Sequence, residues 1–247
     1  CNLTKISRED LKNKLEEEGV TVEVIPEVKE ALVISNYDSL QRLSSFQNGE
    51  FYIQDLSSMK VAEIANPQKD QYIIDMCAAP GGKSLHLAEK LEGTGMVDAR
   101  DVSWKKVDQI LENKKRIGLH NLEAKLQDAT ILDPESIDLA DIVIADVPCS
   151  GLGVISKKVD IKYKMTPEKI KEIVILQRQI LEVAGTYVKA NGFLVYSTCT
   201  INREENQENV QWFLQKFPDF ECCFEEQILP IDGKQDGFFI SKLEKKG

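Results

Sequence analysis

The stretch that decides the fold reads Tyr72-Ile73-Ile74-Asp75-Met76-Cys77-Ala78-Ala79-Pro80-Gly81-Gly82-Lys83-Ser84. It opens with a short apolar run that is typical of a buried strand. A turn of small residues follows, and residues 84–91 have a helical pattern. Small residues let the backbone approach a ligand closely, and the start of the helix presents free N–H groups. The stretch therefore predicts a strand, a ligand-binding loop and a helix.

The same alternation recurs along the chain. Further strands are predicted over 95–99, 122–126, 142–145 and 193–196, and helices over 104–117 and 167–189. Short apolar strands that alternate with helices imply an α/β fold, with a mostly parallel sheet covered on both faces. Ligands of such sheets bind outside the carboxyl ends of the strands.

Chemically reactive side chains gather at those strand ends, which predicts a single site. They are residues 77–83, Asp101, Asp128, 146–149 and 197–199. Asp101 follows Gly82 by 19 residues, and a carboxylate there suits hydrogen bonds from ribose hydroxyls. Asp98 is less suitable because it is predicted to lie inside the strand. Asp128 is placed to accept from an adenine amino group.

The first 48 residues are predicted to form a small α/β unit, and residues 49–247 a second unit. A helix starts after Ser7, and short strands follow over 20–25 and 31–34. This segment is too short for a large core, so we expect it to pack against the second unit. The chain begins with Cys1 instead of Met, so we expect a fragment or a processed product.

Composition and charge narrow the class of protein. The net charge is −10. No apolar run approaches the roughly 20 residues that cross a bilayer, so no membrane span is expected. Residues 155–203 carry nine basic and four acidic side chains. This basic segment predicts an anionic partner, contacted by Lys157, Lys158, Lys162 and Lys164, with a lysine-rich solvated helix face as the alternative.

The cysteines and histidines point to a reducing compartment. Six cysteines without a CxxC pair, and two histidines, predict free thiols in a cytoplasmic protein and no metal site. Two of the thiols follow predicted strands, in Asp146-Val147-Pro148-Cys149 and Ser197-Thr198-Cys199-Thr200. A buried cysteine is usually an inert small hydrophobe. Two at neighbouring strand ends, facing a cofactor crevice, favour chemistry.

Two nucleotide-binding patterns compete for the glycine loop. A dinucleotide fingerprint G-x-G-x-x-G is absent. Gly82-Lys83-Ser84 fits the end of a P-loop, but Cys77 stands where the first glycine should be. The apolar run that ends in Asp146 also resembles a strand ending in a magnesium-binding carboxylate. A P-loop-like nucleotide hydrolase therefore stays open as the alternative from another class.

Three motifs give the chain a specific resemblance. The segments 75–84, 146–153 and 196–200 resemble the signature motifs of the Sun (Fmu) family of S-adenosylmethionine-dependent RNA cytosine-C5 methyltransferases. The segments 49–55, 204–206 and 236–239 reinforce the match, which covers about residues 1 to 243. The resemblance implies a class I (Rossmann-like) methyltransferase fold, with a mostly parallel seven-stranded sheet and a small N-terminal appendage.

The resemblance also implies a role for each site residue. The methionine end of S-adenosylmethionine would be held by Cys77, Ala78, Ala79, Pro80, Gly81, Gly82 and Lys83. Asp101 would hold its ribose and Asp128 its adenine. Asp146 would lie between the cofactor and the target base. Cys199 would be the nucleophile and Cys149 would assist product release, although DNA cytosine methyltransferases use a Pro-Cys thiol, which here is Cys149.

The implied reaction methylates carbon 5 of a cytosine in RNA through a covalent cysteine adduct. The expected substrate is 16S ribosomal RNA, with transfer RNA as the alternative and with the target cytosine single-stranded or flipped out. Residues 1–48 are expected to bind RNA, and the family's additional N-terminal helical domain is expected to be missing. We expect a monomer that contacts no membrane and no metal.

Overall fold

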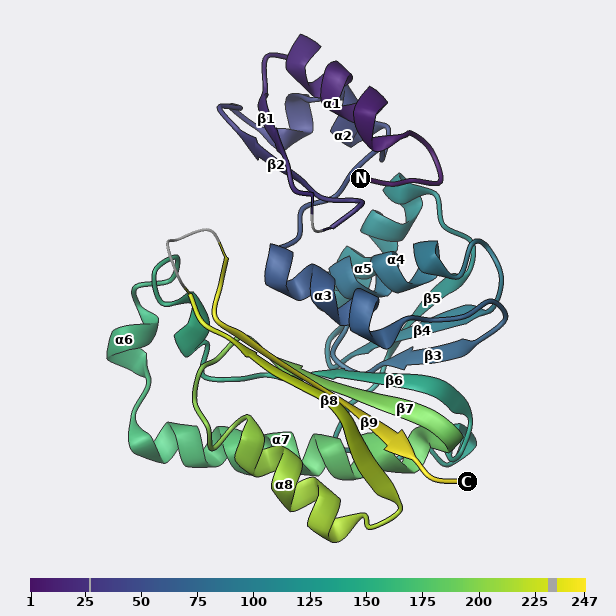
Figure 1. Ribbon diagram of the computed structural model, residues 1–247, viewed down its shortest axis with the longest axis vertical. Coiled ribbons are helices and arrows are strands. Elements are labelled where there is room, and N and C mark those ends of the chain that lie inside the picture. The colour runs from purple at the N-terminus through teal and green to yellow at the C-terminus, as the bar shows by residue number, and fades with distance from the viewer. Residues whose placement is uncertain (27, 231–234) are drawn as a thin grey trace.

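A central sheet of seven strands organises the molecule (Figure 1). The computed structural model describes residues 1–26, 28–230 and 235–247. The strand order is β5-β4-β3-β6-β7-β9-β8. The strands are β3 (Tyr72–Asp75), β4 (Met96–Asp101), β5 (Leu122–Leu126), β6 (Ala140–Asp146), β7 (Val188–Thr198), β8 (Phe220–Ile228) and β9 (Phe238–Lys245). The first five pair with one another in parallel, as predicted, whereas β9 runs antiparallel to both β7 and β8.

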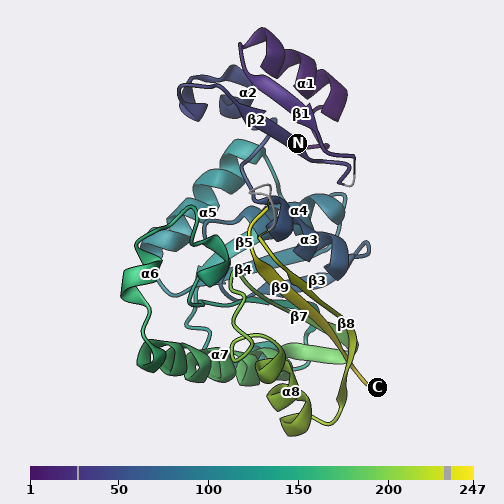
Figure 2. The ribbon, with the colours of Figure 1, turned by 60° about the vertical axis from the view of Figure 1, so that its left-hand side comes forward.

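Helices cover both faces of this sheet, as the sequence predicted. One face carries α3 (Leu56–Ala65), α4 (Gly82–Lys90) and α5 (Trp104–Ile117), and the other carries α7 (Pro167–Tyr187) and α8 (Gln207–Lys216) (Figures 1 and 2). A short helix, α6 (Ile161–Lys164), precedes α7. Each helical layer encloses its own apolar cluster against the sheet. Single turns of 3-10 helix lie at η2 (Pro134–Ser136) and η3 (Leu152–Val154).

Capping explains why several helices begin and end where they do. The Thr166 side chain accepts a hydrogen bond from the Lys169 N–H, and Pro167 occupies the first turn of α7. Gly118 ends α5 in the left-handed conformation, with φ +86°. The structure confirms the predicted bounds of α5 and β5. It ends α7 at Tyr187, two residues before the predicted end, because β7 starts at the next residue.

The N-terminal segment forms its own two-stranded sheet above the helices α3 to α5 (Figure 1). It contains α1 (Arg8–Glu17), β1 (Thr21–Val24), β2 (Leu32–Ser35), η1 (Leu40–Arg42) and α2 (Ser44–Gln47). Ser7 caps α1 by accepting from the Asp10 N–H, as the sequence predicted. The division of the chain at residue 48 and the assignment of RNA binding to residues 1–48 stay predictions.

Two further findings bear on the class of protein. All six cysteines are free thiols. In the parts of the chain that the structure describes, no helix is both long and apolar enough to cross a bilayer.

Candidate functional site

A cavity of about 440 Å³ opens at the carboxyl ends of the parallel strands. That volume lies within the range of small-molecule sites, roughly 300–1,000 Å³. Most of the predicted glycine loop forms its wall, together with residues from four other segments. The predicted site residues in its lining are Cys77, Ala78, Ala79, Pro80, Gly82, Lys83, Asp146 and Cys199. Four other predicted residues, Gly81, Asp101, Asp128 and Cys149, do not line it.

The loop between β3 and α4 owes its shape to a glycine and a buried carboxylate. Gly81 caps α4 with φ +107°, a conformation that strains any residue with a side chain. The Ala79 N–H donates to Asp101 Oδ2 at 3.0 Å, so the end of β4 fixes the loop. Asp101 Oδ1 accepts the Val102 N–H at 2.7 Å and lies 3.0 Å from Lys106 Nζ. Asp101 is thus a positioning group for the loop, whatever else it binds.

The two other predicted carboxylates have different surroundings. Asp128 Oδ1 accepts hydrogen bonds from the N–H and hydroxyl of Thr130, at 2.9 and 2.7 Å, in a turn after β5. Asp146 ends β6, inside the cavity. Its Oδ2 lies 2.6 Å from Lys83 Nζ, and its Oδ1 accepts the Ser197 hydroxyl at 2.8 Å. Lys83 and Ser197 therefore fix the orientation of the Asp146 carboxylate.

The two predicted thiols lie together although 50 residues separate them in sequence. Cys149 Sγ and Cys199 Sγ are 3.2 Å apart. A hydrogen bond from Cys149 lowers the pKa of the Cys199 thiol. The same interaction, added to burial, raises the pKa of Cys149 well above its usual value. Of the two thiols, Cys199 is therefore the one that ionises more readily to the thiolate, which is the nucleophilic form.

A buried carboxylate holds both thiol loops in place. Glu205 is 0% exposed and accepts the Ser150 N–H at 2.8 Å and the Ser150 hydroxyl at 2.5 Å. It also accepts from Asn202 Nδ2 at 3.2 Å and from Gln177 Nε2 at 3.1 Å. Since Ser150 follows Cys149, this network ties the Cys149 loop to the loop that carries Cys199.

The structure changes the interpretation of the basic segment. Lys157 Nζ bridges the carboxylates of Asp55 and Asp236, each at 2.9 Å. Lys164 pairs with Asp160 at 2.6 Å. These ion pairs compete with phosphate for both lysines, whereas Lys158 lines the cavity. Lys158 is therefore better placed than Lys157 to contact an anionic ligand.

Sequence reasoning missed several residues of the site. Asp75 ends β3 in the cavity wall, fully buried, and accepts the Ser84 hydroxyl at 2.6 Å. Burial raises the pKa of Asp75 to about 7. Gln54, Asp236 and Phe238 also line the cavity, from distant segments. A carboxylate that ends an apolar strand was a usable signal for Asp75, but nothing in the local pattern placed Gln54 there.

Comparison with known proteins agrees with this geometry. Residues 62–244 match the model of the family described as "16S rRNA methyltransferase RsmB/F". The Bacillus subtilis (strain 168) protein named "Probable ribosomal RNA small subunit methyltransferase B" is 38% identical over all of this chain and 59% of its own length. The Pyrococcus horikoshii "tRNA (cytosine(72)-C(5))-methyltransferase" is 35% identical over 97% of this chain and 62% of its own length. The chain thus spans about three fifths of these curated relatives.

Solved structures give the same result for the fold. NSun6 from Pyrococcus horikoshii, crystallised with SFG, superposes with a TM-score of 0.89 at 26% identity, over 100% of this chain and 89% of that one. A methyltransferase homologue from the same organism superposes with a TM-score of 0.84 at 29% identity, over 99% of this chain and 84% of that one. The sheet and its helices are a class I methyltransferase fold, as predicted. The chain belongs to the RsmB/F family of 16S rRNA methyltransferases.

Proposed function

We propose that this chain binds S-adenosylmethionine in the 440 Å³ cavity and methylates carbon 5 of a cytosine in RNA, with Cys199 as the nucleophile. One observation carries the assignment of the nucleophile: of the two neighbouring thiols, Cys199 lines the cavity and Cys149 does not. The direction of their pKa shifts supports the same choice, since the pKa of Cys199 is lowered and that of Cys149 is raised.

The cavity fits the proposed cofactor. The cofactor carries an ammonium and a sulfonium charge, and the carboxylates of Asp75 and Asp146 line the cavity. The glycine loop and the start of α4 present backbone N–H groups to its carboxylate. Asp101 and Asp128 lie outside the cavity lining, so the ribose and the adenine are proposed to extend beyond it to reach them. The ribose would replace Lys106, which now pairs with Asp101. The solved NSun6 structure with SFG supports binding at this fold.

The residues in the cavity supply the groups that the reaction needs. Bound cofactor supplies an electrophilic methyl group. The Cys199 thiolate would add to carbon 6 of cytosine, and carbon 5 would then take the methyl group while the methyl–sulfur bond breaks and leaves its electron pair on the cofactor sulfur. The Lys83–Asp146 pair is proposed to give a proton to nitrogen 3 of the adduct and to take it back at the end of the reaction. A base would remove the carbon 5 proton, the double bond between carbons 5 and 6 would re-form, and the thiolate of Cys199 would leave.

Covalent trapping tests the roles of the two thiols. We propose that Cys149 assists elimination, so Cys149→Ala should accumulate an RNA-linked protein on a denaturing gel. Cys199→Ala and the double variant should form none. Trapping by Cys199→Ala alone would reverse the two roles. If both single variants keep full turnover, the thiols are packing residues and covalent catalysis is wrong.

Calorimetry tests the cofactor against the P-loop alternative. In the structure, the Ser84 hydroxyl donates to Asp75 and is 0% exposed, so it is not available to a nucleotide-bound magnesium ion. We expect S-adenosylmethionine to bind and ATP not to bind. Magnesium-dependent binding of ATP without any binding of S-adenosylmethionine would overturn the proposal.

Two RNA substrates remain as candidates, and each has support. The Bacillus subtilis relative favours 16S ribosomal RNA, and the Pyrococcus horikoshii relative favours transfer RNA. We propose 16S ribosomal RNA because the matching family model carries that description. Fragment masses of both RNAs, after incubation with labelled cofactor, decide between them: label in transfer RNA alone would select the second candidate.

A further inference from the structure

A cluster of potential metal ligands lies away from the catalytic cavity, where residues 1–48 meet the helices of the sheet. Glu30 comes from the turn before β2, Glu63 from α3 and His86 from α4. One ligand atom from each residue lies within 4.8 Å of the other two. Because the three residues come from three separate elements, their spacing in sequence gave no signal, and the sequence predicted no metal site.

His86 is the least expected member of this cluster. Its side chain is 1% exposed, and neither ring nitrogen has a hydrogen-bond partner among the described residues. A buried polar group without a partner costs about 1–3 kcal/mol. Neutral imidazole is also the most common metal ligand among side chains. A buried imidazole with a free lone pair beside two carboxylates therefore points to a cation.

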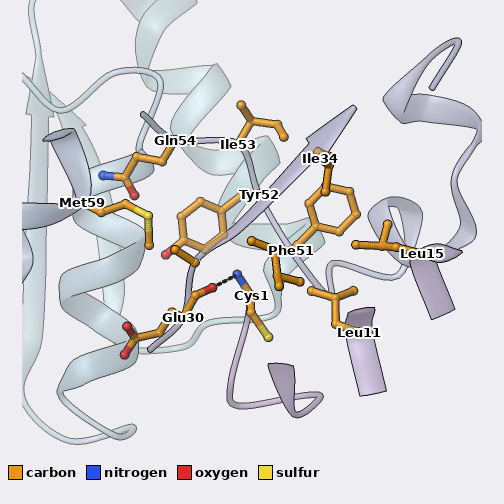
Figure 3. Close-up of a pocket in the computed structure, with 12 residues that line it drawn as sticks. Cys1, Leu11, Leu15, Glu30, Ile34, Phe51, Tyr52, Ile53, Gln54 and Met59 are labelled. Carbon is orange, nitrogen blue, oxygen red and sulfur yellow. Dashed lines mark hydrogen bonds between the residues drawn. The ribbon is translucent and has the colours of Figure 1, made fainter. Parts of the chain in front are cut away.

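The distances suit a small transition-metal ion. Zinc binds imidazole nitrogen at about 2.0–2.1 Å and carboxylate oxygen at about 2.0–2.2 Å, so tetrahedral ligand atoms lie about 3.4 Å apart. His86 Nε2 and Glu63 Oε1 are already 3.5 Å apart. The Glu30 carboxylate lies within 4.8 Å of both, so it has to approach by at most about 1.4 Å to reach the same ligand-to-ligand separation. Its side chain is partly exposed, at the edge of the pocket that Figure 3 shows.

One ion pair competes with metal binding. Lys90 Nζ lies 2.7 Å from the same Glu63 oxygen. Glu63 is 41% exposed, and such a pair contributes at most about 1 kcal/mol. A divalent ion, which carries twice the charge and bonds directly to three ligands, displaces the ammonium group of Lys90.

We propose that Glu30, Glu63 and His86 bind one divalent transition-metal ion of the Zn²⁺ type, with water completing its coordination. The imidazole ligand selects this class, because Mg²⁺ and Ca²⁺ prefer oxygen ligands alone. The ion joins the loop before β2 to α3 and α4. It therefore fastens the N-terminal segment to the sheet-bearing part of the chain, and its role is structural.

Titration of the chelator-treated protein with Co²⁺ and Zn²⁺ tests this proposal. The six free thiols are the confounding ligands, and Co²⁺ separates the two kinds of site because a thiolate ligand adds a sulfur-to-metal charge-transfer band. We expect one equivalent of Co²⁺ without that band. Glu63→Gln and Glu30→Gln should each weaken binding at least tenfold. Glu92→Gln, an exposed carboxylate beyond the end of α4, should leave it unchanged.

Thermal unfolding provides the second measurement. Zn²⁺ should raise the melting temperature of the unmodified chain and of Glu92→Gln, and not that of Glu63→Gln or Glu30→Gln. Both test variants alter partly exposed side chains, so we expect them to fold. The check is their melting temperature in the presence of chelator, which should equal that of the unmodified chain. The proposal is overturned if Co²⁺ does not bind, or if it binds only with the thiolate band. It is also overturned if both variants bind the metal as tightly as the unmodified chain, or if Mg²⁺ binds equally well.

Discussion

Glu205 shows how a residue outside the cavity can govern the chemistry inside it. Its carboxylate joins the loops of the two thiols, and no other described acidic side chain contacts Ser150. Glu205→Gln keeps the size of the side chain but replaces one accepting oxygen with a donor. The Ser150 N–H or hydroxyl then faces an N–H group, which costs about 1–3 kcal/mol.

We therefore expect Glu205→Gln to lower kcat for methyl transfer at least tenfold with little change in cofactor affinity. Single-turnover kinetics and calorimetry measure the two quantities. Glu204→Gln, the exposed neighbouring carboxylate, is the matched control and should retain full kcat. If cofactor affinity and kcat fall together in Glu205→Gln, the network supports the whole cavity and not the thiol loops alone.

Asp75 predicts a pH dependence of folding stability. Burial raises its pKa from 3.8 to about 7 in the folded chain, so the folded state binds more protons than the unfolded state between these values. The stabilising contribution is complete below pH 3.8 and is lost as the pH rises to 7. With about 1.4 kcal/mol per pH unit, the loss reaches roughly 4 kcal/mol.

Urea unfolding at pH 5 and pH 7.5 measures this contribution. The unmodified chain should lose more free energy of unfolding over that interval than Asp75→Asn, which has no charge to titrate and still accepts from Ser84. The difference between the two chains isolates Asp75 from the other titrating groups. Equal pH slopes in both chains would contradict a raised pKa at this position.

The sequence predicted which strand-end residues line the cavity better than it predicted the residues around them. The cavity brings together Cys77, Lys83, Asp146 and Cys199. Each lies at the carboxyl end of a parallel strand or in the loop or helix that follows it, and these strand ends meet at one edge of the sheet. Asp236 and Phe238 reach the same cavity from β9 and the residues before it. That placement depends on how β9 pairs with β7, which no local pattern in the sequence reveals.

At the scale of elements, local signals explain which predictions were accurate. The bounds of α5 were predictable because its apolar positions are periodic and Gly118 ends it. The helices α3 and α8 and the strands β8 and β9 were not identified by residue range. β8 is an edge strand with mostly exposed residues, so it lacks the apolar pattern of a buried strand. Only the family resemblance predicted all seven strands.

The turn η3 provides a test at this scale, because it lies between two backbone segments of the site. The Gly153 N–H donates to the Cys199 carbonyl at 3.1 Å, and its carbonyl accepts the Gly237 N–H at 2.9 Å. A Cβ at Gly153 would lie 2.0 Å from the Gly237 carbonyl oxygen and 2.8 Å from that of Cys199. Backbone must therefore move to accept any side chain there.

We expect Gly153→Ala to lower the free energy of unfolding by about 1–3 kcal/mol, the usual cost of overpacking. Covalent trapping of RNA should fall as well, because the Cys199 backbone shifts. Gly93→Ala is the control for RNA trapping, since its Cβ meets nothing within 4 Å; its φ of +77° strains an alanine, so it is no reference for the free energy of unfolding. Urea unfolding and gel analysis measure the two effects, and a stable Gly153→Ala with full trapping would contradict the packing argument.

At the scale of the whole molecule, Arg116 joins the N-terminal segment to the sheet. This arginine of α5 donates to the carbonyls of Phe46 and Phe51 at 3.0 and 2.9 Å, and its guanidinium lies 3.8 Å from the centre of the Phe46 ring. Buried Asn2 adds hydrogen bonds to the carbonyls of Gly49 and Ile117. An apolar cluster of Val28 and Ala31 with Met59 of α3 adds a further contact between the two parts of the chain.

Arg116→Met keeps much of the apolar stem and removes the charged donors. Hydrogen bonds to a charged group contribute about 1.5–3 kcal/mol each, so we expect a loss of roughly 2–4 kcal/mol that falls mainly on the N-terminal segment. Limited proteolysis during heating should then cleave within residues 1–48 before the sheet unfolds. Lys115→Met, an exposed neighbour on α5, should retain one transition. If Arg116→Met also unfolds in a single transition, the N-terminal segment and the sheet form one cooperative unit and the division at residue 48 is wrong.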